Sequence, residues 1–324
     1  MATTTEELEA SLDRSAEGAE VPTVRRSFRS MGTTVTVIGP APSARTGWTA
    51  VEQATAEVER IFVREDQRFS RFRRGTEISR VNARAGRWTK VSAPFLEVLR
   101  LSLEAAEITG GLFDPTVLPA LLAAGYDRDF DEVLAGARLA LNPPEPCGRW
   151  RDIEVRDREI RFPPGAALDF GGIAKGWTVD VAARRVRRRL PWVVVDAGGD
   201  LVVVGRTPAG GLPIGVEHPD DRTRELLRLH LVRGALATSS TRDRTWGPDL
   251  HHIIDPRLGL PASTGVMQAT AWASTCAAAE IGAKWALLDG DAALERVAAI
   301  VVRTDGSVVS SLPGDAAGAH EGDE

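Results

Sequence analysis

A glycine-containing segment in the middle of the chain, residues 168–180, does most to restrict what the sequence can fold into. It reads LDFGGIAKGWTVD, so an apolar entry and Asp169 lead into Gly171–Gly172, and Lys175 follows at the start of a helical pattern. A strand that ends through glycines at a helix N-terminus favours anion binding, because backbone N–H groups face the ligand and a lysine adds positive charge. An ordinary strand-to-helix turn with a solvated lysine gives the same pattern, so other motifs must decide.

The bulk composition indicates a soluble globular protein that can bury a large core. The chain has 324 residues, of which 43% are hydrophobic and 26% charged. Its formal net charge of −5 argues against general nucleic-acid binding. The two cysteines, Cys147 and Cys276, form no disulfide framework and indicate a reducing compartment.

The two ends of the chain differ from the rest. Residues 1–23 and 313–324 are small, polar and acidic, which is typical of disordered tails. Residues 24–312 are expected to form one folded unit. The N-terminus does not read as a secretory signal, and no apolar run approaches the length of a membrane span, which together predict a cytoplasmic protein.

Strand signals outnumber regular strand–helix–strand units, which predicts an α+β fold with mixed, largely antiparallel sheets flanked by helices. Apolar and β-branched runs predict strands within 25–38, 191–205, 226–232 and 266–273, and hairpins at 150–162 and 298–312. The spacing of apolar residues predicts helices at 50–62, 93–108 and 276–288.

Five further clusters are candidates for chemistry, although each is weak alone. They are 31–33, 69–82, 110–117, 195–200, and 238–240 followed by 251–259. Phe72 is suited to lie against a flat ring, whereas Asp114, next to Pro115, is open to a turn role or a ligand-binding role. Asp196 and Asp200 flank a glycine pair and are interpreted as turn residues that bind backbone rather than ligand.

Adjacent histidines, His251 and His252, stand in the last of these clusters. Neighbouring side chains of a strand point to opposite faces, so the two histidines are not expected to share a metal, and one can be buried while the other faces a cleft. A cleft-facing histidine near hydroxyl groups and an acid has the parts for proton transfer near neutral pH, while a structural histidine fits the pattern too. The chain has no GxSxG motif, which excludes the serine-hydrolase interpretation.

Taken in order, these motifs resemble the FAD:protein FMN transferases, the ApbE family of flavin transferases. The resemblance covers about residues 25–290 and rests on seven segments: 31–33, 69–82, 110–116, 168–176, 198–200, 237–239 and 252–259. It implies an ApbE-like fold. The implied reaction requires Mg²⁺, moves the FMN half of FAD onto a threonine hydroxyl of a flavoprotein acceptor, and releases AMP.

The resemblance also implies roles for single residues. Residues 168–176 hold the diphosphate with Lys175 as a fixed cation, and Thr238 and His252 lie near the reacting phosphate, where His252 assists deprotonation of the threonine. Phe72 stands where the family usually has tyrosine, which keeps stacking and removes a phenol hydrogen bond. The set expected to bind the flavin nucleotide is Met31, Phe72, Leu112, Phe113, Asp114, Asp169, Gly171, Gly172, Lys175, His252, Ile254 and Asp255.

The chain departs from the family at the magnesium ligands. Where the family's C-terminal helix offers an aspartate and, four residues on, a threonine, this chain has Glu280 and Lys284. Glu280 is a possible oxygen ligand for Mg²⁺ together with the carbonyl of Gly172, but an ammonium group only donates. Lys284 therefore either replaces part of the charge of the metal or closes the site by pairing with Glu280.

Many family members are exported lipoproteins, and the absence of their signal and lipidated cysteine here implies an acceptor in, or facing, the cytoplasm. Two alternatives to transfer remain open. One is a protein that binds FAD without cutting it, and the other is an FAD pyrophosphatase that gives FMN to water and releases AMP.

Overall fold

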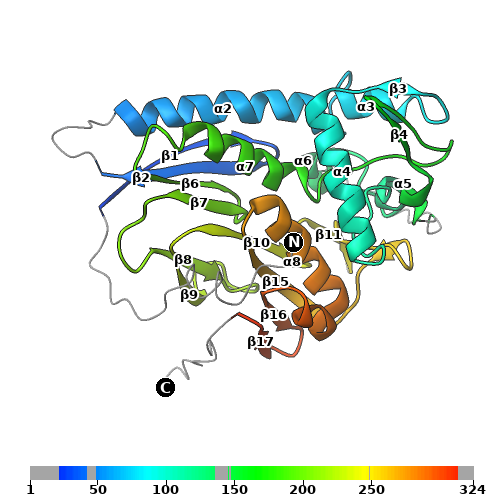
Figure 1. Cartoon of the computed structure of the whole chain (residues 1–324). Coiled ribbons are helices and arrows are strands. Elements are labelled where there is room, and N and C mark those ends of the chain that lie inside the picture. Colours follow the sequence, from blue (N-terminus) through cyan, green and yellow to red (C-terminus); the bar gives the residue numbers. More distant parts are fainter. Residues whose placement is uncertain (1–21, 42–48, 136–144, 146, 248, 313–324) are drawn as a thin grey trace.

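The structure is a computed structural model that describes residues 22–41, 49–135, 145, 147–247 and 249–312 (Figure 1). The expected tails lie outside the described residues except for Pro22 and Thr23, and Thr23 is the first residue of strand β1. Within the described residues, none of the helices combines the length and the apolar character that a membrane crossing requires.

An antiparallel sheet forms the centre of the fold. Within the described residues it has eight strands in the order β1-β2-β6-β7-β10-β15-β16-β17. They are β1 (Thr23–Ser30), β2 (Thr33–Pro40), β6 (Trp192–Ala197), β7 (Leu201–Gly205), β10 (Gly234–Ser240), β15 (Val266–Ala273), β16 (Ala299–Arg303) and β17 (Val308–Ser310). Every neighbouring pair runs antiparallel, which confirms the predicted α+β class.

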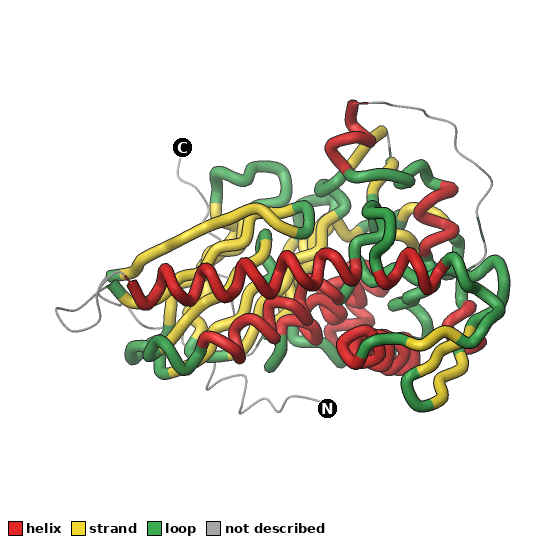
Figure 2. Tube along the Cα trace, turned by 90° about the horizontal axis from the view of Figure 1, so that it is seen from above, coloured by secondary structure: helices red, strands yellow, loops and turns green. Residues whose placement is uncertain are grey.

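Both faces of this sheet are covered. Helices α2 (Thr49–Phe69), α7 (Ala174–Val186) and α8 (Cys276–Asp289) lie on one face, and the hairpin of β8 (Leu212–Glu217) and β9 (Glu225–Leu231) packs on the other (Figures 1 and 2). In β6, Val193 and Val195 join the core under the helices, while Trp192 and Val194 join the core under the hairpin. Because alternate side chains of a strand face opposite ways, this double coverage explains the uninterrupted apolar run of β6.

The other elements gather mainly around the end of α2 that finishes at Phe69 (Figure 1). The longer ones are α3 (Glu77–Asn82), α4 (Ala93–Ile108), α5 (Leu118–Ala123), α6 (Phe130–Ala135), and the 3₁₀ helices η1 (Arg149–Asp152) and η2 (Gly290–Glu295). The short strands are β3 (Thr89–Lys90), β4 (Glu154–Arg156), β5 (Glu159–Arg161), β11 (Thr245–Gly247), β12 (Leu250–His251), β13 (Ile254–Asp255) and β14 (Leu260–Pro261). A second core joins Phe69, Phe95, Phe170 and Trp177.

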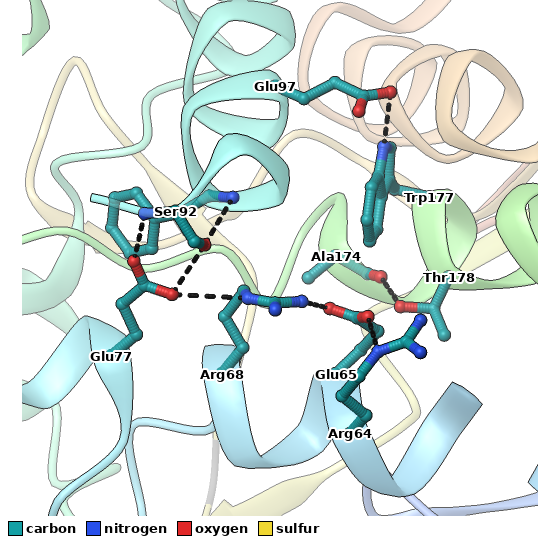
Figure 3. A network of polar contacts seen from close by, with 10 residues as sticks. Arg64, Glu65, Arg68, Glu77, Ser92, Glu97, Ala174, Trp177 and Thr178 are labelled. Carbon is teal, nitrogen blue, oxygen red and sulfur yellow. Dashed lines mark hydrogen bonds and ion pairs between the residues drawn. The ribbon is translucent and has the colours of Figure 1, made fainter. Parts of the chain in front are cut away.

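Helix α2 is longer than predicted. The prediction for 50–62 stopped before a charged stretch, but the helix continues to Phe69. Glu65 is 1% exposed in this stretch and pairs with Arg64 at 2.8 Å and with Arg68 (Figure 3). The two guanidinium groups satisfy the buried carboxylate, so the added turns bury a charge without leaving it unpaired.

The same polar network continues from α2 into α3 and α4 (Figure 3). Arg68 Nε lies 3.2 Å from Glu77 Oε2, and Glu77 accepts hydrogen bonds from Ser92 N at 2.6 Å and Ser92 Oγ at 2.7 Å. Ser92 is the N-cap of α4 and accepts the backbone N–H of Phe95. The network therefore fixes where α4 begins relative to α2.

Asp180 of α7 holds the N-terminus of α8, and we expect it to make stability depend on pH. Its carboxylate accepts the N–H groups of Cys276 at 2.8 Å and Ala277 at 3.0 Å. Burial raises the pKa of Asp180 from 3.8 to about 6. The folded state therefore binds an extra proton between these values, and the stability that Asp180 contributes is full at low pH and is lost as pH rises through about 6.

The Asp180→Asn variant keeps a carbonyl oxygen and removes the titration. The free energy of unfolding of the wild type, relative to that of Asp180→Asn, is expected to fall by about 2 kcal/mol from about pH 4 to about pH 7. Urea denaturation of both proteins across this range measures the difference. A difference that does not change with pH contradicts the assignment.

Candidate functional site

A cavity of about 590 Å³ lies where the end of α2 meets the start of α7 and the middle of α8. Its lining comes from within Arg29–Gly32 around the turn between β1 and β2, Asp66 and Phe69–Arg73 at the end of α2, Leu112–Asp114, the stretch 117–132 around α5 and α6, Asp169–Lys175 at α7, Arg244, His252–Pro256, and Lys284 and Leu288 of α8. These segments lie far apart in the sequence, so the fold of the whole described unit builds the cavity.

The segment before α7 enters the cavity as a loop, not as the predicted strand. Residues 162–173 form no strand, although Leu168 and Phe170 alternate with the less buried Asp169 and pack with Ile173 into one core. The Asn82 side chain takes the place of a neighbouring strand. It donates to Leu168 O at 2.9 Å and accepts Leu168 N–H at 2.8 Å.

Arg71 fixes the acid of this loop. Its Nε lies 2.8 Å from Asp169 Oδ2, and its Nη1 donates to Tyr126 O at 2.8 Å. Asp169 Oδ1 accepts the N–H of Gly171 at 2.7 Å, so the carboxylate is both neutralised and tied to its own turn. Among the described residues, the buried Nη2 of Arg71 has no hydrogen-bond partner. An unpaired buried donor beside a cavity is suited to an acceptor atom of a ligand.

Arg71 also belongs to an aromatic wall. Its guanidinium carbon lies 4.1 Å from the centre of the Phe72 ring and 4.6 Å from that of Tyr126. Tyr126 stacks on Trp246 with ring centres 5.2 Å apart. Phe72 is 36% exposed, so its ring is available to a planar ligand group. Phe72 was predicted from the sequence as a binding residue, whereas Arg71, in the same cluster, was given no role and Tyr126 was not predicted.

Lys175 is paired with an acid. Its Nζ lies against Asp200 Oδ2, and Asp200, which is 2% exposed, also accepts the N–H of Thr238 at 3.3 Å. Asp196 accepts the N–H of Gly199, as the turn interpretation expects, but Asp200 does more than bind backbone. Burial lowers the pKa of Lys175, an effect that the charge of Glu280 opposes. Lys175 lines the cavity with its charge partly compensated by Asp200.

Lys284 reaches the cavity next to the glycine loop. A Cβ atom built on Gly172 would lie 2.9 Å from Lys284 Cε, so the side chain of this lysine would have to shift if residue 172 carried a Cβ. Lys284 Nζ lies 3.3 Å from Glu280 Oε1, which is the ion pair that the spacing on the helix predicts. Glu280 Oε2 accepts the N–H of Gly176 at 2.9 Å. Burial would raise the pKa of Glu280, but Lys284, Lys175 and this hydrogen bond hold that pKa below its ordinary value.

These residues do not fit a divalent cation. Both oxygens of Glu280 are engaged, and the ammonium of Lys284 has no lone pair to donate to a metal. Within the described residues, no group of three or more histidine, cysteine, aspartate or glutamate side chains is arranged to hold a metal ion. The magnesium ligation by Glu280 and Gly172 that the resemblance implies therefore stays a prediction without support from this donor set.

The two histidines have different environments. His251 is 5% exposed, and its ring contacts the carbonyl of Ala262 and the N–H of Ile253. His252 lines the cavity, and its Nδ1 lies 3.2 Å from the carbonyl oxygen of Asp243. A carbonyl only accepts, so this nitrogen carries the proton and Nε2 holds the lone pair of the neutral ring. Burial, together with Arg244 and Lys284, holds the pKa of His252 well below 6.5.

The structure places most of the predicted site residues around the cavity and leaves three outside its lining: a binding residue, a catalytic residue and a metal ligand. Met31, Phe72, Leu112, Phe113, Asp114, Asp169, Gly171, Gly172, Lys175, His252 and Ile254 line it. Thr238, Asp255 and Glu280 are not among the lining residues. Thr238 bonds to Thr270 at 2.9 Å, and Asp255 pairs with Arg257 at 2.7 Å.

Asp114 lines the cavity, but its oxygens are used by the protein. Oδ1 accepts the N–H and hydroxyl of Thr116 at 2.7 and 2.5 Å, and Oδ2 accepts the N–H of Gly148 at 2.5 Å. Of the two roles left open by the sequence, these contacts favour the turn role. Arg244 is a further cavity residue that the sequence did not single out, because nothing near it in the chain marks it as part of a motif.

Comparison with known proteins shows which family the chain belongs to. The model of the ApbE family matches residues 31–304. The FAD:protein FMN transferase of Vibrio cholerae serotype O1 is 25% identical over 234 residues, which cover 69% of this chain and 70% of that protein. The FAD:protein FMN transferase of Chlamydia trachomatis serovar D is 27% identical over 219 residues, covering 65% of this chain and 67% of that protein.

Solved structures show the same fold. The ApbE protein of Thermotoga maritima superposes with a TM-score of 0.75 at 22% identity, covering 89% of this chain and 96% of that one. The flavin transferase ApbE of Vibrio cholerae gives a TM-score of 0.74 at 22% identity, with 89% and 96% covered. Because the family model spans most of the described residues and the fold agrees over nearly the same length, this chain belongs to the ApbE family.

Proposed function

We propose that this chain is an FAD:protein FMN transferase, which moves the FMN half of FAD onto a threonine hydroxyl of a protein acceptor and releases AMP. The observation that carries the proposal is the combination, within one cavity of about 590 Å³, of an aromatic wall and a neutral histidine among cations. The wall suits a planar ring, and the cations suit a diphosphate. Family membership supplies the reaction class, since the relatives compared above carry this name.

The proposed step is a phosphoryl transfer. The threonine oxygen forms a bond to the phosphorus of the FMN half, and the bond from that phosphorus to the oxygen bridging the two phosphates breaks. The bridging oxygen leaves with AMP, and the hydroxyl proton passes to the enzyme. Such reactions depend mainly on positioned phosphates and on charges that stabilise the transition state.

We assign His252 as the base that accepts the proton of the threonine hydroxyl. Its Nδ1–H is held by the carbonyl of Asp243, and its lowered pKa keeps the ring neutral. Nε2 then carries a free lone pair at neutral pH, and a general base must be in this unprotonated form to accept a proton. Thr238, one of the predicted catalytic residues, lies behind Lys175 through Asp200, so its role is assigned to positioning that ion pair.

The charges around the diphosphate are assigned to the chain itself. Lys175, Arg244 and Lys284 line the cavity, and Arg244 and Lys284 act on the same histidine. At the aromatic end, the unpaired Nη2 of Arg71 is assigned a hydrogen bond to an acceptor atom of the bound nucleotide. A cytoplasmic acceptor, as expected from the sequence, remains a prediction.

The test uses FAD, the purified chain and the acceptor protein of the Vibrio cholerae relative, with that relative as the positive control. Mass spectrometry of the acceptor and chromatography of nucleotides are read from the same reaction. Covalent FMN on the acceptor, together with an equal amount of AMP, supports transfer. Free FMN and AMP with an unmodified acceptor indicate a pyrophosphatase, and intact FAD indicates a binding protein. Either of these results overturns the proposal.

A further inference from the structure

Lys284 lies beside the glycine loop, at a position where the family resemblance implies a magnesium ligand. Its Nζ is 3.3 Å from Glu280 Oε1, and its Cε packs against the backbone of Gly172. Its side chain is 18% exposed and lines the cavity, whereas Glu280 is 3% exposed and lies behind it. The ammonium of Lys284 therefore lies between the carboxylate of Glu280 and the cavity proposed to bind FAD.

A metal ion and this ammonium exclude one another. A divalent cation at Glu280 would meet the positive charge of Lys284 at close range in a poorly solvated place, where repulsion is little screened. Mg²⁺ also requires several oxygen ligands at about 2.1 Å, and here one oxygen of Glu280 is held by Gly176 N–H while the other faces Lys284. An ammonium, in contrast, needs no ligand cage and donates directly to phosphate oxygens.

We propose that Lys284 takes the place of the divalent cation, so that this chain binds the diphosphate of FAD and transfers FMN without Mg²⁺. The inference rests on the proposed function. The bonds formed and broken are those of the transfer step above, Lys284 keeps its protons throughout, and no co-reactant is added. Glu280 orients Lys284 toward the loop, and Gly172 leaves the space through which it reaches the cavity.

The neighbouring cations agree with this assignment. Lys175 and Arg244 line the same cavity, and Arg244 and Lys284 are both close enough to His252 to disfavour its protonation. Three positive side chains thus face the region where two phosphates must be held next to the base. A diphosphate bound there exchanges water for charged donors that the fold has already positioned.

The wild-type protein provides the first measurement. FAD affinity, followed by isothermal titration calorimetry in EDTA and in excess Mg²⁺, is expected to agree within about twofold, because a bound Mg²⁺ that the ligand needed would shift the equilibrium by far more. The rate of FMN transfer is likewise expected to be the same in EDTA and in excess Mg²⁺. Affinity that is at least about tenfold tighter with Mg²⁺ overturns the inference.

Variants of the chain test the residue itself. Lys284→Thr is expected to bind FAD about tenfold more weakly in EDTA, because it loses a charged donor to phosphate. Mg²⁺ is expected to restore the affinity, since a hydroxyl and Glu280 then offer oxygen ligands, and adding Glu280→Gln is expected to abolish the rescue. Lys90→Thr, an exposed lysine in β3, is the matched control and should leave FAD affinity unchanged. Unchanged affinity of Lys284→Thr in EDTA contradicts the inference.

The two proposals fail in different ways. If FAD binds equally with and without Mg²⁺ but no acceptor is ever modified, the transferase function fails and the inference holds for binding. If the acceptor is modified only when Mg²⁺ is present, the function holds and the inference fails. The melting temperature of each variant, measured alongside, separates loss of binding from loss of folding.

Discussion

The His252→Ala variant is expected to transfer FMN about 10²- to 10⁴-fold more slowly than the wild type, with FAD affinity changed by less than about tenfold. The reason is the state of the ring. Nδ1–H is held at 3.2 Å by the carbonyl of Asp243, and burial among cations keeps the ring neutral. The lone pair on Nε2 then accepts the threonine proton, and alanine offers no substitute.

The neighbouring histidine supplies the control. His251 is buried, and both of its ring nitrogens contact backbone groups, so it has no free lone pair for catalysis. His251→Gln is expected to lower the melting temperature with little effect on the transfer rate of the folded protein. Equal losses of rate in His252→Ala and His251→Gln would show that His252 is structural.

The pH profile follows from the same pKa. Because the pKa of His252 lies well below 6.5, the imidazole remains a base as pH falls through 6.5, and the rate is lost only in more acidic solution. The value of kcat/KM for FMN transfer is therefore expected to be the same just above and just below pH 6.5, and to fall only at more acidic pH. A midpoint at or above 6.5 contradicts the environment described for this ring.

Replacing Lys175 with methionine is expected to lower the free energy of unfolding by about 3–5 kcal/mol, because it leaves the buried carboxylate of Asp200 without its cation. Asp200 is 2% exposed, and among the described residues its carboxylate would then keep only the N–H of Thr238. Chemical denaturation measures the loss. A loss below about 1 kcal/mol would show that the Lys175–Asp200 pair behaves as an exposed ion pair.

A double variant separates the structural from the binding role of Lys175. Lys175→Met with Asp200→Asn removes both charges and is expected to recover most of the lost stability. FAD affinity is expected to remain weakened, because Lys175 also lines the cavity. Full recovery of affinity in the double variant would remove Lys175 from the diphosphate site.

The elements that the sequence predicted well are those with a strong periodic pattern. The helix predicted at 93–108 is α4, and the strand predicted at 266–273 is β15, with the same bounds. Both contain long apolar patterns, and the spacing of apolar residues along the chain is enough to identify such elements. Within 25–38, the β-branched run 33–38 predicted as a strand lies in β2, and the residues before it add strand β1, because Met31 and Gly32 adopt positive φ and reverse the chain. Strand β10, which reads GALATSS, lacks a β-branched run and was not predicted.

The parts of the candidate site that were predicted correctly are those that a local sequence motif marks. The loop from Asp169 to Lys175 carries its own glycines and charge, and it does line the cavity. The prediction that a strand leads into this loop was wrong, because the backbone of Leu168 bonds to the side chain of Asn82 and not to a neighbouring strand. Partners distant in sequence, such as Asp169 with Arg71 and Lys175 with Asp200, follow from the tertiary fold and leave no local signal.

Transfer without Mg²⁺ is tested by the mass of the acceptor after incubation with FAD, this chain and EDTA, beside a reaction in which Mg²⁺ replaces EDTA. We expect one FMN added per acceptor, one AMP released for each, and no change when Mg²⁺ is supplied. An acceptor that stays unmodified in both reactions, while the Vibrio cholerae relative modifies it with Mg²⁺, would contradict the proposed transferase.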